Sequence, residues 1–231
     1  MKFPYRVLVR PLAVLLMVLL SAVSLQAADY SIEVLKEGPP ADALAKEIAA
    51  EISDTGYAIK RSETSTLCNI WFCKQWNVDP DFEPTLSVLY PFEPGQLIGV
   101  IEYKRRGEDF RAQDLDRGVY TLRYALQPVD GNHVGTSATR DFLLVVTAEN
   151  DTSPKAMDIR ELYTASAEAA ESSHPGLLLM QHVPDDADTS KPSIKQNDDE
   201  WWTARLIGAA GKDGKTKPLA IDLVVEGHAD E

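Results

Sequence analysis

The chain has 231 residues, with 36 acidic and 23 basic side chains and a formal net charge of -13 at pH 7. Binding to nucleic acid depends on neutralising phosphates with Lys and Arg, so this composition argues against a nucleic-acid partner. Hydrophobic residues make up 44% of a chain that is long enough to bury one sizeable core.

The first segment, residues 1–27, has the pattern of an export signal. Its opening carries three basic residues, Lys2, Arg6 and Arg10. The uncharged run from Pro11 to Leu25 is shorter than the ~20 apolar residues that a membrane-spanning helix needs. Ala27 supplies the small residue that a signal peptidase requires. The sequence predicts a cleaved leader and a periplasmic or extracellular product without stable membrane insertion; an uncleaved anchor is the alternative.

One amphipathic helix is expected soon after the leader. Leu44, Ile48 and Ile52 recur every four residues within the range Ala41 to Ile52, as on the buried face of a helix. Gly56 follows at a position that can end this helix.

From Tyr57 onward, short apolar runs with a period of two alternate with Pro, Gly and Asp, which is typical of antiparallel strands. A second helix is expected from Asp158 to about Ala170. Because no strand-helix-strand rhythm is present, residues 28–231 are predicted to form a single, mainly β domain with an N-terminal helix. Its expected class is an antiparallel β-sandwich, either jelly-roll or immunoglobulin-like without the disulfide. The expected strands are Tyr57–Lys60, Leu67–Trp76, Leu86–Tyr90, Leu97–Lys104, Gly118–Gln127, Asp141–Val146, Gly176–Gln181, Trp201–Ile207 and Leu219–Glu226.

The clearest alternation lies in the strand before the longest loop. Tyr120, Leu122 and Tyr124 share one face, and Thr121 and Arg123 lie on the other. This pattern predicts one buried face and one face that is at least partly exposed to water.

Cys68 and Cys73 are the only cysteines. On one strand, residues five apart point to opposite faces and lie ~16 Å apart, beyond the ~7 Å limit between Cα atoms of a disulfide. We therefore expect two free, buried thiols; a disulfide would need a turn inside this apolar run. The spacing also matches no zinc signature.

The motif Gly118-Val119-Tyr120-Thr121-Leu122-Arg123-Tyr124 is followed by Gln127-Pro128, Asp130-Gly131-Asn132-His133 and Arg140-Asp141-Phe142. In these segments the chain resembles a group of uncharacterised secreted bacterial proteins with a signal peptide and a β-rich domain. The likeness extends from about Leu67 to Val225. It implies export and a mainly β fold, and it implies no activity.

The loop from Pro128 to Arg140 is the main candidate binding surface. It is longer than a hairpin needs, and long loops between well-defined strands often carry binding residues. Its turn chemistry places Asp130, Asn132 and His133 on an exposed connector. The candidate binding residues are these three and Arg140. In the alternative, Asp130 and Asn132 only cap the turn and His133 is a solvated side chain.

A metal site is a second hypothesis for the same region. His174 precedes Pro175, which favours an extended backbone at the start of a strand. If the sheet brings this end beside the long loop, then His133, His174 and Asp130 form a His-His-carboxylate site. The spacing does not require this, because a single His at a strand edge is also common as a hydrogen-bonding surface residue.

No serine stands in a Gly-x-Ser-x-Gly setting, so the sequence identifies no catalytic nucleophile. The preferred hypothesis is a secreted, non-catalytic protein that binds an unknown ligand or protein partner through its loop end. The alternative is a periplasmic metal-binding protein or metal-dependent enzyme that uses His133 and His174. The sequence identifies no cofactor.

Overall fold

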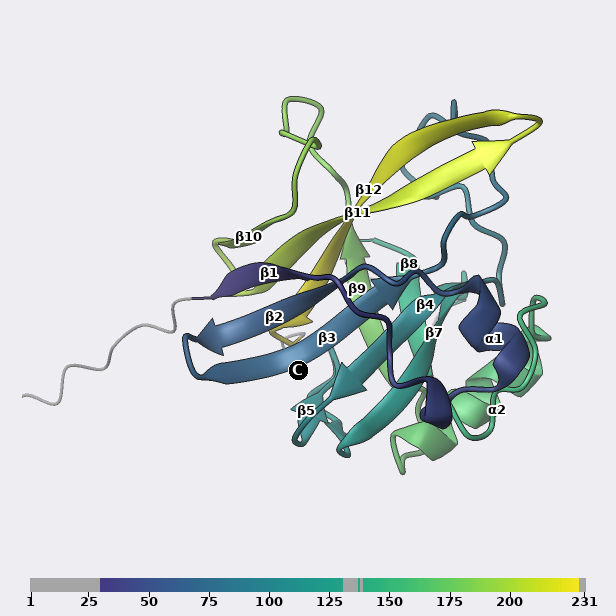
Figure 1. The fold of residues 1–231 in the computed structure, drawn as a ribbon, viewed down its shortest axis with the longest axis vertical. Helices are drawn as coiled ribbons and strands as arrows, with labels where there is room; N and C mark the ends of the chain where they lie inside the picture. Colours follow the sequence, from purple (N-terminus) through teal and green to yellow (C-terminus); the bar gives the residue numbers. More distant parts are fainter. Residues whose placement is uncertain (1–29, 131–136, 138, 229–231) are drawn as a thin grey trace, which may run out of the picture.

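Antiparallel strands account for most of the structure, a computed structural model that describes residues 30–130, 137 and 139–228 (Figure 1). The predicted leader, residues 1–27, lies outside these ranges. The helices are the 3-10 helix η1 Ala41–Ala43, α1 Lys46–Glu51 and α2 Ile159–Ala169. The strands are β1 Ser31–Leu35, β2 Gly56–Ser62, β3 Ser65–Phe72, β4 Leu97–Tyr103, β5 Gly107–Glu108, β6 Asp114–Leu115, β7 Gly118–Leu126, β8 Asp141–Thr147, β9 Leu177–Gln181, β10 Ser193–Gln196, β11 Trp202–Lys212 and β12 Lys215–Glu226. The predicted mainly β, antiparallel class is confirmed.

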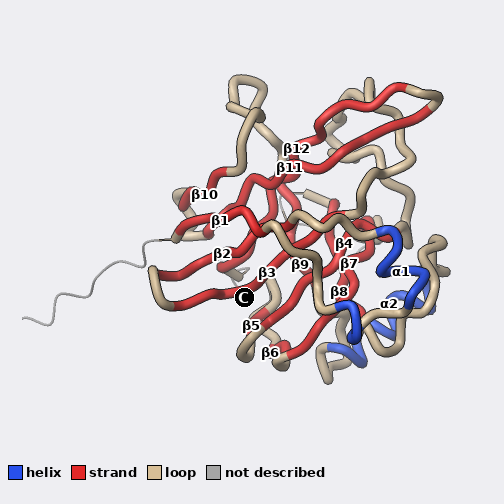
Figure 2. The backbone as a smooth tube through the Cα atoms, viewed as in Figure 1, coloured by secondary structure: helices blue, strands red, loops and turns tan. Residues whose placement is uncertain are grey.

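Ten strands form one hydrogen-bonded sheet in the order β1-β2-β3-β4-β7-β8-β9-β12-β11-β10. The sheet curls until its edge strands, β1 and β10, lie side by side, so it is nearly closed like a barrel (Figure 2). Among the described residues, side chains rather than a β ladder join the two ends. Tyr30 stacks on Trp202 with ring centroids 4.4 Å apart, and Arg61 forms an ion pair with Glu226.

The inside of the curled sheet is filled by side chains around Trp76. This residue is fully buried, and its indole Nε1 donates a hydrogen bond to the Ile98 carbonyl at 2.9 Å. Phe72 and Phe92 make edge-to-face contacts with its ring at centroid distances of 5.0 and 5.1 Å. At Gly208, a Cβ atom would lie 2.1 Å from the same ring. Packing this dense favours a ligand site on the outside of the sheet rather than inside it.

The outer face of β7, β8 and β9 is also covered. Phe142, Leu144 and Val146 alternate with residues that face the inside, and they form a second hydrophobic cluster with Leu162 of α2. Asp158 caps this helix by accepting hydrogen bonds from the first backbone N–H groups. The second helix is therefore confirmed close to its expected bounds.

The prediction that one face of β7 is at least partly exposed to water is wrong, since Thr121 and Arg123 on that face are buried. The segment leading into α2 covers this face, and Asp151 in that segment binds both side chains. A polar side chain can be buried when its hydrogen-bonding groups are all paired. The polar residues that alternate with apolar ones in β7 are therefore not exposed to solvent.

The helix predicted over Ala41–Ile52 is interrupted. Leu44 adopts an extended conformation between η1 and α1, and Ile52 pairs with Cys73 in an isolated bridge. The expected buried residues are nevertheless right, because Leu44, Ile48 and Ile52 all lie in the core. None of the described helices is long and apolar enough to cross a membrane.

Two other expectations along the chain are wrong. The segment Leu86–Tyr90 is not a strand: Thr85 Oγ1 accepts a hydrogen bond from the Val88 N–H, which closes a turn, and Leu86 is fully exposed. The edge strand β10 lies between the expected strands Gly176–Gln181 and Trp201–Ile207, where no strand was predicted.

Cys68 and Cys73 are free and buried, as predicted. Burial raises the pKa of the Cys73 thiol to about 12, and it raises the pKa of Cys68 further. Because the thiolate is the reactive form, neither thiol should react with iodoacetamide in the native protein at pH 8. After unfolding without reductant, intact mass should show two labels. An unlabelled chain lighter by two mass units would contradict the free-thiol structure.

Candidate functional site

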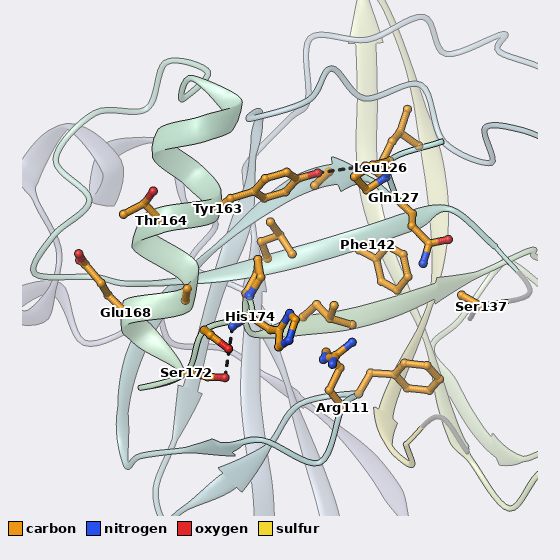
Figure 3. Close-up of a pocket in the computed structure, with 18 of the residues that line it drawn as sticks. Arg111, Leu126, Gln127, Ser137, Phe142, Tyr163, Thr164, Glu168, Ser172 and His174 are labelled. Carbon is orange, nitrogen blue, oxygen red and sulfur yellow. Dashed lines mark hydrogen bonds between the residues drawn. The ribbon is translucent and has the colours of Figure 1, made fainter. Parts of the chain in front are cut away.

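A groove of about 1160 Å³ runs between α2 and the outer face of β7, β8 and β9 (Figure 3). This volume slightly exceeds the ~300–1,000 Å³ typical of small-molecule sites. A second hollow, beside η1, has less than half that volume, at about 520 Å³. The larger groove is therefore the first candidate for a binding site.

The floor of the groove is apolar because β8 is apolar on both faces. In the run Phe142 to Val146, alternate side chains face the inside of the sheet and the others face outward. Val146 is fully buried in the cluster with Leu162, whereas Phe142 and Leu144 line the groove. Ala125 of β7 and Leu177 of β9 extend this floor on either side.

Helix α2 forms one wall through Tyr163, Thr164 and Ala167. The Tyr163 hydroxyl donates a hydrogen bond to the Leu126 carbonyl at 3.2 Å, which fixes its ring beside the end of β7 (Figure 3). Partial burial raises the pKa of this hydroxyl, so it remains protonated and able to donate.

The opposite wall comes from the turn between β5 and β6. Asp109 is buried there, and its carboxylate accepts hydrogen bonds from the backbone N–H groups of Arg111 and Gln113 at 2.8 Å and of Leu177 at 3.0 Å. The Gln113 side chain donates to the same carboxylate at 2.8 Å. Ala112 has a φ of 56°, a left-handed conformation that this network holds in place. The turn thus presents Arg111 to the groove from a fixed backbone.

His174 lies at the same end of the groove as Arg111. The Gln113 side chain donates to the Pro175 carbonyl at 3.1 Å, and the Phe110 N–H donates to the Leu177 carbonyl at 2.8 Å, so the turn packs against the segment that carries His174. The backbone N–H of His174 donates to Ser172 Oγ at 3.3 Å. Among the described residues, neither the Arg111 guanidinium nor the His174 imidazole has a hydrogen bond or an ion pair with another side chain.

The long loop borders the other part of the groove through Pro128 and Ser137 (Figure 3). Asp130 is exposed on this loop, whereas Asn132 and His133 lie outside the described residues. Their expected role in binding stays a prediction.

Arg140 holds the base of this loop. Its guanidinium donates two hydrogen bonds to the Gln127 carbonyl, at 3.0 and 2.8 Å, and thereby joins the two ends of the loop. The neighbouring Asp141 is buried and accepts hydrogen bonds from the Tyr124 hydroxyl at 2.5 Å and the Leu89 N–H at 3.0 Å. Burial raises the pKa of its carboxyl. These contacts give the motif Arg140-Asp141-Phe142 a structural meaning: it closes the loop, anchors a neighbouring segment and lines the groove.

The predicted metal site is not assembled by the described residues. Leu144 pairs with Leu177, so the start of β9 lies beside the middle of β8, and His174 lies beyond it, away from the loop that ends at Asp141. The part of the chain that the structure describes contains no group of three or more His, Cys, Asp or Glu residues suited to a metal ion. Because His133 lies outside that part, the metal hypothesis stays untested.

Sequence reasoning identified His174 but missed the groove and Arg111. One signal for the groove was present: the unbroken apolar run in β8 indicates a strand covered on both faces. No signal was available for Arg111, since its placement depends on the pairing of the β5–β6 turn with β9.

Comparisons with protein-family models, curated proteins and solved structures find no match to this chain. The resemblance to secreted bacterial β-rich proteins therefore stays an expectation from the motif alone.

Proposed function

We propose that this protein is a non-catalytic binding protein that takes an amphipathic ligand in the groove between α2 and β7, β8 and β9. The observation that supports this most directly is an open groove with an apolar floor built from Phe142, Leu144 and Leu177. Removing apolar ligand surface from water at such a floor contributes roughly 25 cal/mol per Å². The inside of the sheet is filled around Trp76, which favours the outer groove.

The polar groups of the groove suit binding better than catalysis. Ser172 Oγ accepts a hydrogen bond from the backbone N–H of His174. Among the described residues its hydroxyl donates none to the imidazole, so this pair lacks the nucleophile-base contact of a hydrolase. The long loop borders the groove, so the loop end expected to bind a ligand remains part of the proposal. Export to the periplasm or cell exterior and a sandwich-like core also remain predictions.

Filling the groove should weaken the binding of an apolar probe. In Ala167→Trp, a large ring enters the groove from α2, and we expect its affinity for the neutral dye N-phenyl-1-naphthylamine to fall about tenfold or more, equivalent to about 1.4 kcal/mol. Dye fluorescence measures the binding, and circular dichroism checks that the variant is folded.

The matched control is Glu161→Trp, which adds the same ring at an exposed position of α2 that does not line the groove. It should bind the dye like the parent. Equal binding by both variants, or no binding by the parent, would rule out the groove as an apolar ligand site.

A further inference from the structure

Within the described part of the chain, the Arg111 guanidinium is an unpaired cation in an acidic protein. Acidic residues outnumber basic ones by 36 to 23, yet no ion pair to Arg111 occurs among the described residues. Asp109, two residues away, forms no ion pair with Arg111, because its carboxylate oxygens accept hydrogen bonds from backbone N–H groups and from the Gln113 side chain. The acid that holds the turn thus leaves the cation free to meet a ligand.

Figure 3 shows how the charged groups of the groove are arranged. The side chains of Arg111 and His174 extend toward one another, and the Glu168 carboxylate points away from both. Glu171 also lines this end, from the turn after α2. The polar head of a ligand whose tail follows the apolar floor would therefore meet a guanidinium and an imidazole on one side.

We propose that the ligand is an anionic amphiphile, a long-chain carboxylate, whose head is bound by Arg111 and whose tail lies on Phe142, Leu144 and Leu177. This inference rests on the proposed function of the groove. A guanidinium can bind a carboxylate through two parallel hydrogen bonds, which an ammonium cannot do. His174 supplies a second donor at the same end.

The test compares C12 amphiphiles that differ only in the head: dodecanoate, dodecan-1-ol and dodecylammonium. Each competes with N-phenyl-1-naphthylamine on the full chain. The parent should bind dodecanoate about tenfold or more tightly than dodecanol. In Arg111→Gln this preference should disappear while the affinity for dodecanol is unchanged. Acetate, which has the same head without a tail, should not compete.

Arg117→Gln is the matched control, because Arg117 is exposed and does not line the groove; it should keep the parent's preference. Equal binding of dodecanoate and dodecanol, or a preference that survives in Arg111→Gln, overturns this inference and leaves the apolar groove intact. Tightest binding of dodecylammonium would assign recognition to Glu168 and Glu171 instead. If none of the three displaces the dye and Ala167→Trp has no effect, the proposed function itself fails.

Discussion

Asp151→Asn should lower the free energy of unfolding by about 3–5 kcal/mol, because it leaves Arg123 as an uncompensated charge in the protein interior. Both side chains are only 1% exposed, and Arg123 Nε lies 2.7 Å from Asp151 Oδ2. Thr121 donates to the same carboxylate oxygen at 2.5 Å. Removing one partner of a buried ion pair lowers the free energy of unfolding far more than removing one partner of a surface pair.

Arg123 also holds the segment that precedes α2. The Arg123 guanidinium donates hydrogen bonds to the carbonyls of Gly95 at 2.7 Å, Ser153 at 2.5 Å and Lys155 at 2.9 Å, and so fixes the segment that leads into the helix. Asp151→Asn should therefore also weaken dye binding in the groove. Urea unfolding measures the stability. The dye-binding assay is done at low urea, and the binding is corrected for the fraction of the variant that is folded there.

The control is Asp114→Asn, which removes one partner of the exposed pair with Arg106. Its free energy of unfolding should be close to that of the parent. The double variant Arg123→Met/Asp151→Leu should recover part of the loss, because neither buried charge remains. An Asp151→Asn protein as stable as the Asp114→Asn protein would contradict this account of the buried pair.

Trp76→Ala should lower the free energy of unfolding by about 3–5 kcal/mol, the range for truncating a large buried aromatic side chain. The substitution removes the contacts with Phe72 and Phe92 and one of the two hydrogen bonds to the Ile98 carbonyl, which still accepts from the Cys73 N–H. Leu86→Ala, at a fully exposed position, should have little effect on urea unfolding.

Gly208 supplies a sharper test of the same packing. Gly208→Ala should destabilise the parent, since the new Cβ would lie 2.1 Å from the Trp76 ring, but it should be better tolerated when residue 76 is Ala. Such non-additivity marks two positions that share one space. Additive losses in the double variant would mean that Trp76 does not occupy the space above Gly208.

The spacing of apolar residues predicted a helix or strand well where a single period extended over the whole element. The strands β4, β7 and β8 and the helix α2 lie close to their expected bounds because their apolar patterns are long and end at turn residues. The edge strand β10 is short and polar, so its sequence resembles a loop, and only its pairing with β11 makes it a strand. In the segment before β2, the period of four selected the right buried residues but not the break at Leu44.

The site was less predictable than the fold. His174 was singled out for a partnership with His133, but the sheet register places it at the Arg111 end of the groove. Arg140 was expected to bind a ligand, and the structure shows its guanidinium on the Gln127 carbonyl. Both placements depend on contacts between distant segments, which local spacing does not encode, and the expected binding roles of the two residues stay predictions.

The near-closure of the sheet has a consequence for the order of folding. Most neighbours in the sheet are also neighbours in sequence, and the hairpins of β2 with β3 and of β11 with β12 close short loops. By contrast, β9 must find β12, and β1 must reach β10, across long stretches of chain, and such pairings form slowly. If the chain is exported N-terminus first, as a leader over residues 1–27 would require, the sheet stays open until β11 and β12 have followed. We expect the unclosed edges of β1 and β9 to be the surfaces that need protection during that interval.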